Sequence, residues 1–415
     1  MTMHANPAGG VFAEITLERG GGRVRAVSTG SLRRDAVLAV GRALVGRPVA
    51  REAGGAIEAF LRAIYALCPE AHAAAWRAAA AEATGEPLTD AERHDLSIRV
   101  AVEAAVEHLR FLAFDAPRAL GLPVDERLAD LGRLRASAAA LLALPEVTAE
   151  RREALLGLLS QGVAQFVTGE DPKAFRGTKS LADLLFWTAG RGTAAARLLY
   201  ALWREAPQAF AYESRPLIAA ELPGLGARGF DPLCPMVSGA PRATAAALRF
   251  CAHPVVAAVN EGHFLSLRAL YVARLISLLA TVRGEIGDDA EHVRAQGAPA
   301  AGSASIGPGA GLAWVETARG TLVMRVTVTS EGRLARLEAA APTEWNFARG
   351  GLVAELLSGL RAGASGAQED LRRRALWVTT GIDPCAPCLT RIREEGADGA
   401  ERGADNSINE GGAHA

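Results

Sequence analysis

A chain of 415 residues and 43.2 kDa is long enough to bury a substantial hydrophobic core without disulfide bonds. Its 45 basic and 46 acidic residues give a net charge of -1, which argues against charge-driven binding to nucleic acid or to an anionic membrane. The five cysteines are an odd number and do not form a disulfide framework in so long a chain, so we expect a reducing compartment.

No targeting or membrane-spanning pattern is visible. Residues 1–10 lack a basic segment followed by an apolar one, so no secretory signal is predicted. The longest apolar stretch, Leu267–Val282, carries Arg268 and Arg274 and is shorter than the roughly 20 residues that a membrane span needs. We therefore predict a buried helix there and no membrane insertion.

Hydrophobic periodicity and composition divide the chain into five predicted regions. Alternating polar and apolar positions predict a β-hairpin in residues 1–32, and apolar positions three and four apart predict a helical body over residues 33–285. Residues 286–311 are rich in Gly, Ala, Pro and Ser and predict a loop. Residues 312–391 predict a β-hairpin and a metal motif packed on the body, and the polar residues 392–415 predict a disordered tail.

The strongest local signal for chemistry is a pair of thiols near the C-terminal end, Cys385 and Cys388. A turn brings both sulfurs to one side, where they suit a soft metal. Structural zinc needs four ligands, and Cys251 with His253 would have to supply the other two. A thioredoxin-like redox pair belongs at a strand-to-helix junction within a βαβ unit, which this region does not resemble. The remaining alternative is two buried cysteines without chemistry.

Cys68 and His72 form a second candidate site. Their spacing of four residues puts thiol and imidazole on one face of a helix, where the imidazole can hydrogen-bond a metal-bound thiolate. Considered alone, the pair is also explained by a core cysteine and a surface histidine. The two thiols near the C-terminal end favour a shared metal site.

Five motifs, in the same order, resemble the large subunit of [NiFe] hydrogenases, and the resemblance covers nearly the whole chain. Residues 62–72 are similar to the family motif Arg-x-Cys-Gly-x-Cys-x-x-x-His, and residues 383–388 to Asp-Pro-Cys-x-x-Cys-x-x-His. Between them, residues 314–322 are similar to Glu-Ala-Pro-Arg-Gly-x-Leu, and residues 342–347 to Pro-Thr-Thr-Trp-Asn. Residues 107–115 are similar to the Asp-His...His-Phe-Tyr stretch. Five ordered matches are far more specific than any one of them.

The resemblance implies a role for each cysteine of the two motifs. In the family, one cysteine of each pair bridges nickel and iron, and the other binds nickel alone. Cys68 and Cys388 occupy the bridging positions, Cys385 occupies one nickel position, and Tyr65 replaces the cysteine of the other. A phenol is a poor substitute for a soft thiolate, so the resemblance implies an intact iron half and a weak nickel half.

The resemblance also implies a pocket for the cyanide and carbon monoxide that the family's iron carries. Arg319 and Thr343 fall on the positions that donate hydrogen bonds to cyanide, and a guanidinium offers several donors to an anion. His72 falls on the position that hydrogen-bonds a bridging thiolate. In contrast, Met324 stands where histidine is usual, and no N-terminal glutamate of a proton relay is recognisable. The ligand pocket is thus expected to be retained and the catalytic proton handling degraded.

This combination resembles the HupK family of hydrogenase expression/formation proteins. The resemblance implies an α+β, mainly α fold, with a [NiFe] hydrogenase large-subunit-like helical body and small β elements near both ends. It implies an accessory protein rather than an enzyme, a cytoplasmic scaffold that transiently holds the Fe(CN)2CO unit during [NiFe] hydrogenase maturation. The implied partners are a HypC-type chaperone, a HypD-type assembly protein and the hydrogenase large subunit.

Two other functions stay open. A divergent catalytic [NiFe] hydrogenase large subunit, a nickel-iron oxidoreductase, would bind nickel and a small subunit. An interaction module without metal would tolerate Cys68→Ala, Cys385→Ala and Cys388→Ala.

Overall fold

The computed structural model describes residues 13–20, 23–31, 34–49, 51–124, 126–144, 147–212, 214–284, 301–360, 368–386 and 388–394. The helices are α1 Arg34–Leu44, α2 Arg51–Ile64, α3 Pro69–Thr84, α4 Asp90–Arg110, α5 Ala116–Ala119, α6 Leu128–Leu142, α7 Ala149–Val163, α8 Leu181–Gly190, α9 Ala194–Glu205, α10 Leu222–Arg228, α11 Ala246–Arg249, α12 Pro254–Asn260, α13 Leu267–Val282, α14 Pro342–Asn346, α15 Leu352–Ser358 and α16 Gln368–Ile382. The strands are β1 Ala13–Gly20, β2 Arg23–Ser31, β3 Phe210–Ala211, β4 Leu265–Ser266, β5 Ala301–Gly307, β6 Ala310–Thr317, β7 Gly320–Val328, β8 Leu334–Ala340 and β9 Cys388–Glu394.

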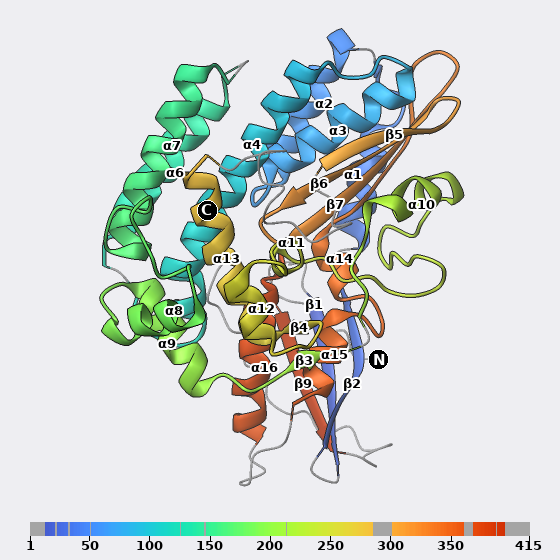
Figure 1. Cartoon of the computed structure of the whole chain (residues 1–415). Helices are drawn as coiled ribbons and strands as arrows, with labels where there is room; N and C mark the ends of the chain where they lie inside the picture. The colour runs from blue at the N-terminus through green and yellow to red at the C-terminus, as the bar shows by residue number, and fades with distance from the viewer. Residues whose placement is uncertain are drawn as a thin grey trace.

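The described elements form a helical body with sheets at two of its sides. A four-stranded antiparallel sheet has the order β5-β6-β7-β8, and a three-stranded sheet has the order β2-β1-β9. In Figure 1, α6, α7, α8 and α9 lie on one side of the molecule, the four-stranded sheet lies on the other, and the three-stranded sheet lies below. This arrangement confirms the predicted α+β, mainly α fold class.

The predicted N-terminal hairpin is confirmed, and a third strand extends it. β1 pairs antiparallel with β2, and β9 pairs parallel with β1, so that Cys388 lies opposite Ala13. The predicted disordered tail over residues 392–415 is therefore wrong for residues 392–394, which belong to β9. Ile392 is only 9% exposed, because it packs into the main hydrophobic core. Residues 395–415 lie outside the described residues.

The prediction of a loop over residues 286–311 is wrong from residue 301 onward. There β5 and the start of β6 pair as antiparallel strands. The small residues there allow close packing, because a Cβ on Gly311 would overlap the carbonyl oxygen of Ala79 in α3. A Cβ on Gly302 would likewise overlap the ring of Trp314. The small residues of this segment, which are typical of linkers, are therefore explained by the close packing of α3 on the sheet. Residues 285–300 are outside the described part of the chain.

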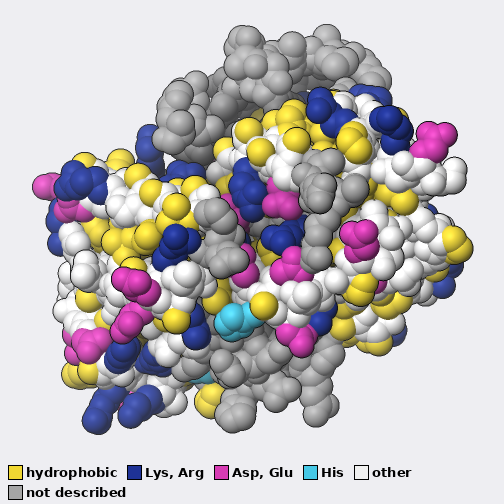
Figure 2. Space-filling view, turned by 90° about the horizontal axis from the view of Figure 1, so that it is seen from above, with side chains coloured by type: hydrophobic (Ala, Val, Ile, Leu, Met, Phe, Trp, Pro, Cys, Tyr) yellow, Lys and Arg dark blue, Asp and Glu magenta, His cyan; other side chains and the backbone are white. Residues whose placement is uncertain are grey.

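The hydrophobic core has a large cluster among the helices and a smaller one where α3 covers the four-stranded sheet. The predicted buried helix is confirmed as α13, in which every residue except Arg268 is buried. Within the described ranges, no helix is both long enough and apolar enough to cross a membrane. Figure 2 shows acidic and basic side chains interspersed on the face seen from above, in keeping with the balanced charge.

Candidate functional site

The first part of the site is the tight turn between β6 and β7, which carries Arg319. The hydroxyl of Thr317 accepts a hydrogen bond from the Arg319 amide at 3.1 Å and donates one to the carbonyl of Gly320 at 2.9 Å. Gly320 has a φ of 131°, and a Cβ there would come within 2.7 Å of the Thr244 backbone. Only glycine fits this position, so the turn is held in one conformation and Arg319 stays buried, at 7% exposure.

Arg319 is the centre of a buried ion-pair cluster. Its Nε lies 3.1 Å from both the carbonyl oxygen and Oδ2 of Asp383, and its Nη2 lies 3.2 Å from Oε2 of Glu107. Nη1 of Arg274 lies 3.2 Å from Oδ2 of Asp383. Burial alone would lower the pKa of Arg319, but Asp383 and Glu107 raise it above its usual range. The cluster therefore holds two guanidinium cations against two carboxylates.

Asp383 links this cluster to the thiols near the C-terminal end. It follows the last residue of α16 and has a φ of 55°, a left-handed conformation that is unfavourable for most side chains but tolerated by aspartate. Its amide donates to the carbonyl of Thr379 at 2.9 Å and closes the helix. Because two arginines bind its carboxylate, the chain is held in this turn and directs Cys385 back toward the cluster.

Thr343, in the first turn of α14, binds Cys385 directly. Its hydroxyl oxygen accepts a hydrogen bond from the Cys385 amide at 3.1 Å and lies 2.9 Å from the Cys385 sulfur. With the oxygen accepting from the amide, the hydroxyl hydrogen can be donated to the sulfur. The predicted role of Thr343 as a donor to cyanide stays a prediction.

The Cys68 segment is held by a carboxylate from another helix. Cys68 is the residue before α3, not a residue within a helix as the four-residue spacing had suggested, and its side chain does not cap the helix. The carboxylate of Glu103 in α4 accepts from the amides of Glu70 at 2.6 Å and Ala71 at 3.1 Å. Burial raises the pKa of Glu103 to about 8, although these two amides act in the opposite direction.

His72 and Tyr65 pack together next to Cys68. The two rings stack with centroids 3.5 Å apart and an interplanar angle of 11°. Nδ1 of His72 lies 2.8 Å from the carbonyl oxygen of Cys68, and the residue is 2% exposed. The imidazole thus contacts the backbone of the cysteine, and its hydrogen bond to a metal-bound thiolate stays a prediction.

Cys68 and Cys385, two of the three predicted metal-binding thiols, interact electrostatically with each other and with Arg319. Burial raises the pKa of Cys68 well above its usual value, the charges of Glu103 and Cys385 raise it further, and Arg319 opposes them. For Cys388, burial alone raises the pKa, to about 12. Among the residues that the structure describes, no three His, Cys, Asp or Glu side chains gather as a metal-binding group. Cys388 as an iron ligand therefore stays a prediction.

Sequence reasoning did not single out Arg274 and Glu103. Both lie in otherwise apolar stretches of buried helices, with exposures of 3% and 9%. A buried charge needs a partner, so an arginine in the middle of a helix as apolar as α13 was a signal for a buried acidic partner. The sequence could not identify that partner as Asp383, which is more than one hundred residues away.

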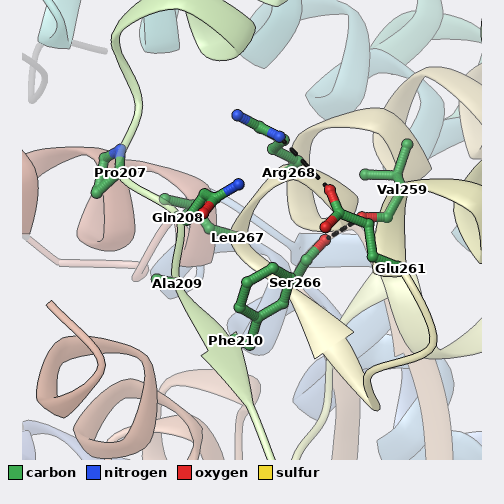
Figure 3. Close-up of a pocket in the computed structure, with 9 residues that line it drawn as sticks. All are labelled: Pro207, Gln208, Ala209, Phe210, Val259, Glu261, Ser266, Leu267 and Arg268. Carbon is green, nitrogen blue, oxygen red and sulfur yellow. Dashed lines mark hydrogen bonds and ion pairs between the residues drawn. The ribbon is translucent and has the colours of Figure 1, made fainter.

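Two pockets on the described surface are lined by other residues. Figure 3 shows a pocket between β3 and the start of α13, lined by residues such as Phe210, Glu261 and Arg268. Its volume of about 10 Å³ holds roughly one water molecule. A larger groove of about 400 Å³ lies between α1, β8 and the segment from Phe230 to Leu233. Neither pocket is lined by a predicted site residue.

Comparison with solved structures identifies the fold. The structure matches the Ni-Fe-Se hydrogenase of Desulfovibrio vulgaris Hildenborough in the reduced state, with a TM-score of 0.52 and 14% identity over 88% of this chain and 94% of that chain. The G491S variant of the [NiFeSe] hydrogenase from the same organism also gives 0.52 and 14%, over 91% and 99% of the two chains. The fold is that of the [NiFe] hydrogenase large subunit.

The sequence relatives form a narrower group, the hydrogenase expression/formation proteins. The chain is 39% identical over 92 residues to HupK of Bradyrhizobium diazoefficiens and 36% identical over 100 residues to HoxV of Cupriavidus necator. It is 28% identical over 186 residues to HupK of Azotobacter vinelandii. These matches cover 22%, 23% and 45% of this chain and only 24%, 25% and 46% of the relatives. No family model matches the chain. The resemblance to proteins of the HupK type is confirmed.

Proposed function

We propose that this chain is an accessory protein of [NiFe] hydrogenase maturation, a scaffold that transiently holds the Fe(CN)2CO unit during its assembly or transfer. The relatives' description as expression/formation proteins supports the accessory role. The iron unit is cargo, so the chain acts by binding and is not an enzyme. A HypC-type chaperone, a HypD-type assembly protein and the hydrogenase large subunit are the proposed partners, in the cytoplasm.

The observation that carries the proposal is the buried Arg319 beside two thiols. Its Nη1 is buried and has no hydrogen-bond partner among the described residues, while its charge acts on both Cys68 and Cys385. A charged donor suits a cyanide bound to iron, and thiolates suit the iron itself. Cys68, Cys385 and Cys388 would hold the iron, Arg319 and Thr343 would bind the cyanides, and His72 would orient Cys68.

The test is metal analysis and infrared spectroscopy of the protein purified without oxygen from a host that expresses the maturation proteins. Iron with cyanide and carbonyl bands and little nickel is expected, and Cys68→Ala should remove these bands. Cys251→Ala is the matched control, because Cys251 is a half-buried thiol outside the site. Neither iron nor bands in repeated preparations would contradict the scaffold and favour a module without metal.

The catalytic alternative predicts a different metal content. A divergent hydrogenase large subunit would contain nickel and iron in equal amounts and would reduce a dye with hydrogen when its small subunit is present. Tyr65 occupies the position of a nickel-binding cysteine in the resemblance, so we expect nickel to appear only after Tyr65→Cys. Equal nickel and iron in the unaltered protein would contradict the proposal.

A further inference from the structure

Helix α8 has an apolar outer face, opposite the side on which Leu184 and Thr188 are buried. It packs against α9 and α12 and lies on the outer side of the helical body (Figure 1). Phe186 is 85% exposed, more than any other large apolar side chain among the described residues. It belongs to a set of exposed residues spaced three and four apart, named here the α8 stripe: Ala182, Leu185, Phe186 and Ala189.

Contacts on the other sides of α8 hold the stripe in place. The hydroxyl of Ser180 accepts a hydrogen bond from the amide of Asp183 at 3.1 Å, at the start of the helix. The indole nitrogen of Trp187 donates to the carbonyl of Thr168 at 3.1 Å, and its ring centroid lies 5.1 Å from that of Phe175. The stripe is therefore preformed, which reduces the entropy cost of binding a partner.

The shape of the stripe suits a second helix. A single exposed apolar side chain is common on protein surfaces, but an aromatic ring within a helical stripe is typical of a docking surface. Ala182 and Ala189 lie one turn before and one turn after Phe186. These small residues leave space on either side of the ring, where large side chains of a partner helix can pack.

Exposed cations lie near both ends of the stripe. Lys179 directly precedes the N-terminal cap of α8, and Arg191 is its C-terminal cap. Lys173 and Arg176 lie on either side of Phe175 in the sequence, whose ring contacts Trp187 of α8. In the described part of the chain, none of these four cations forms an ion pair with a carboxylate.

The cations outnumber the carboxylates around the stripe. Between residues 172 and 192, Asp183 is the only acidic residue, and its carboxylate accepts a hydrogen bond from the hydroxyl of Ser180 at 2.5 Å. Glu170 and Asp171 precede this segment, and even with both included the cations are in excess. This positive surface belongs to a chain with a net charge of -1, and it favours an acidic partner.

We infer that the α8 stripe and its flanking cations form a docking surface for an amphipathic helix of a partner protein, with acidic residues beside its apolar face. A second copy of this chain is disfavoured, because both ends of the stripe are positive and would repel each other. A membrane surface is disfavoured, because only Leu185 and Phe186 are large enough to insert. The proposed iron site contains no residue of α8, so the inference does not rest on the proposed function.

The probe is a designed helical peptide with leucines three and four residues apart, glutamates on both sides of them, an acetylated N-terminus and no lysine. A carbodiimide joins carboxylates to amines in contact, and the only lysines of the chain are Lys173 and Lys179. Mass spectrometry is expected to find the peptide joined to these two residues. Anisotropy titrations should show that Phe186→Ser weakens peptide affinity by about tenfold or more, since a central aromatic residue contributes strongly to binding.

Val45→Ser is the matched control, because Val45 is 53% exposed and follows α1, outside the stripe. Denaturant unfolding of Phe186→Ser should equal that of the unaltered protein, so that a loss of binding is not a loss of folding. Equal peptide affinity of the two variants, or equal affinity for a peptide with lysines in place of the glutamates, would overturn the inference. Without peptide binding, a Phe186-dependent dimer or Phe186-dependent binding to anionic phospholipid vesicles would also overturn it, in favour of a second copy or a membrane.

Discussion

The two thiol-bearing segments are held in place by different physical means. The Cys68 segment is held within the helical body, where the single carboxyl group of Glu103 caps α3 and two stacked rings pack beside the cysteine. The Cys385 segment is held by charges and a hydroxyl from elements far away in the chain, namely Arg319, Arg274 and Thr343. The difference shows that one site can combine a segment fixed mainly by a neutral, packed environment with one fixed by ion pairs.

The largest expected loss of stability comes from breaking the ion pairs that hold the Cys385 segment. Arg319→Leu leaves the buried carboxylate of Glu107 and the partly buried one of Asp383 without their shared partner, and removing one member of a buried pair costs about 3–5 kcal/mol. Denaturant unfolding should show this loss of stability. Arg133→Leu is the control, because Arg133 is mainly exposed and an exposed pair contributes about 1 kcal/mol or less. A loss for Arg319→Leu as small as that of the control would mean that the charges do not hold the turn.

Asp383→Asn is expected to have a smaller effect, about 2 kcal/mol. Asparagine tolerates the left-handed conformation of this position, so the change removes the charge and leaves the backbone preference intact. Asp383 is 20% exposed, which reduces the cost relative to a fully buried pair. Asp383→Ala should be more destabilising than Asp383→Asn, because alanine also disfavours the backbone conformation. The reverse order in unfolding experiments would show that the backbone is not constrained there.

On the side of Cys68, Glu103 is expected to make the stability of the protein depend on pH. Glu103 has a pKa of about 8 in the folded protein against an ordinary value of 4.5, so between these values only the folded protein keeps the proton. Stability therefore falls as the pH rises through this window, by at most about 1.4 kcal/mol per pH unit.

Glu103→Gln cannot titrate, so the stability of the unaltered protein relative to this variant should decline from about pH 5 to 8, within the window that the raised pKa defines. Unfolding curves at several pH values measure the decline, with Glu331→Gln as an exposed control. A constant difference between the two proteins would show that Glu103 is ionised in the folded state.

The smallest effect is expected for Thr343→Val, which keeps the shape of the side chain and removes its hydroxyl. The Cys385 amide then loses its acceptor, at a cost of about 1 kcal/mol. The Cys385 thiol also loses its contact with the hydroxyl, so its reaction with a thiol reagent should change, whereas that of Cys251 should not. An unchanged rate for Cys385 would show that Thr343 does not act on the sulfur.

Much of the fold could be predicted from local patterns, and the exceptions have a common cause. Alternation of polar and apolar residues predicted the hairpins β1–β2 and β7–β8, because their partner strands follow each other directly. The same reasoning missed β5 and β9, since β5 contains small residues that accommodate α3 and β9 pairs with a strand at the opposite end of the chain. Local composition cannot show either requirement.

The residues of the candidate site also fall into a group that local motifs predicted and a group that they did not. The cysteines, Arg319 and Thr343 were predicted because they lie in ordered motifs, and the structure brings Cys68, Cys385, Arg319 and Thr343 into one environment. The supporting residues Glu103 and Arg274 were missed because each acts on a partner in another element.

The sequence by itself predicted the helical body, the local hairpins and the candidate site residues, because periodicity and motifs are properties of neighbouring residues. Only the tertiary structure decided which charges meet, which backbone is strained and which buried histidine has no hydrogen-bond partner among the described residues. Those outcomes depend on burial and on distances between elements far apart in the chain. Burial sets both the free-energy cost of a charge and its need for a partner, so these interactions exist only in the folded protein.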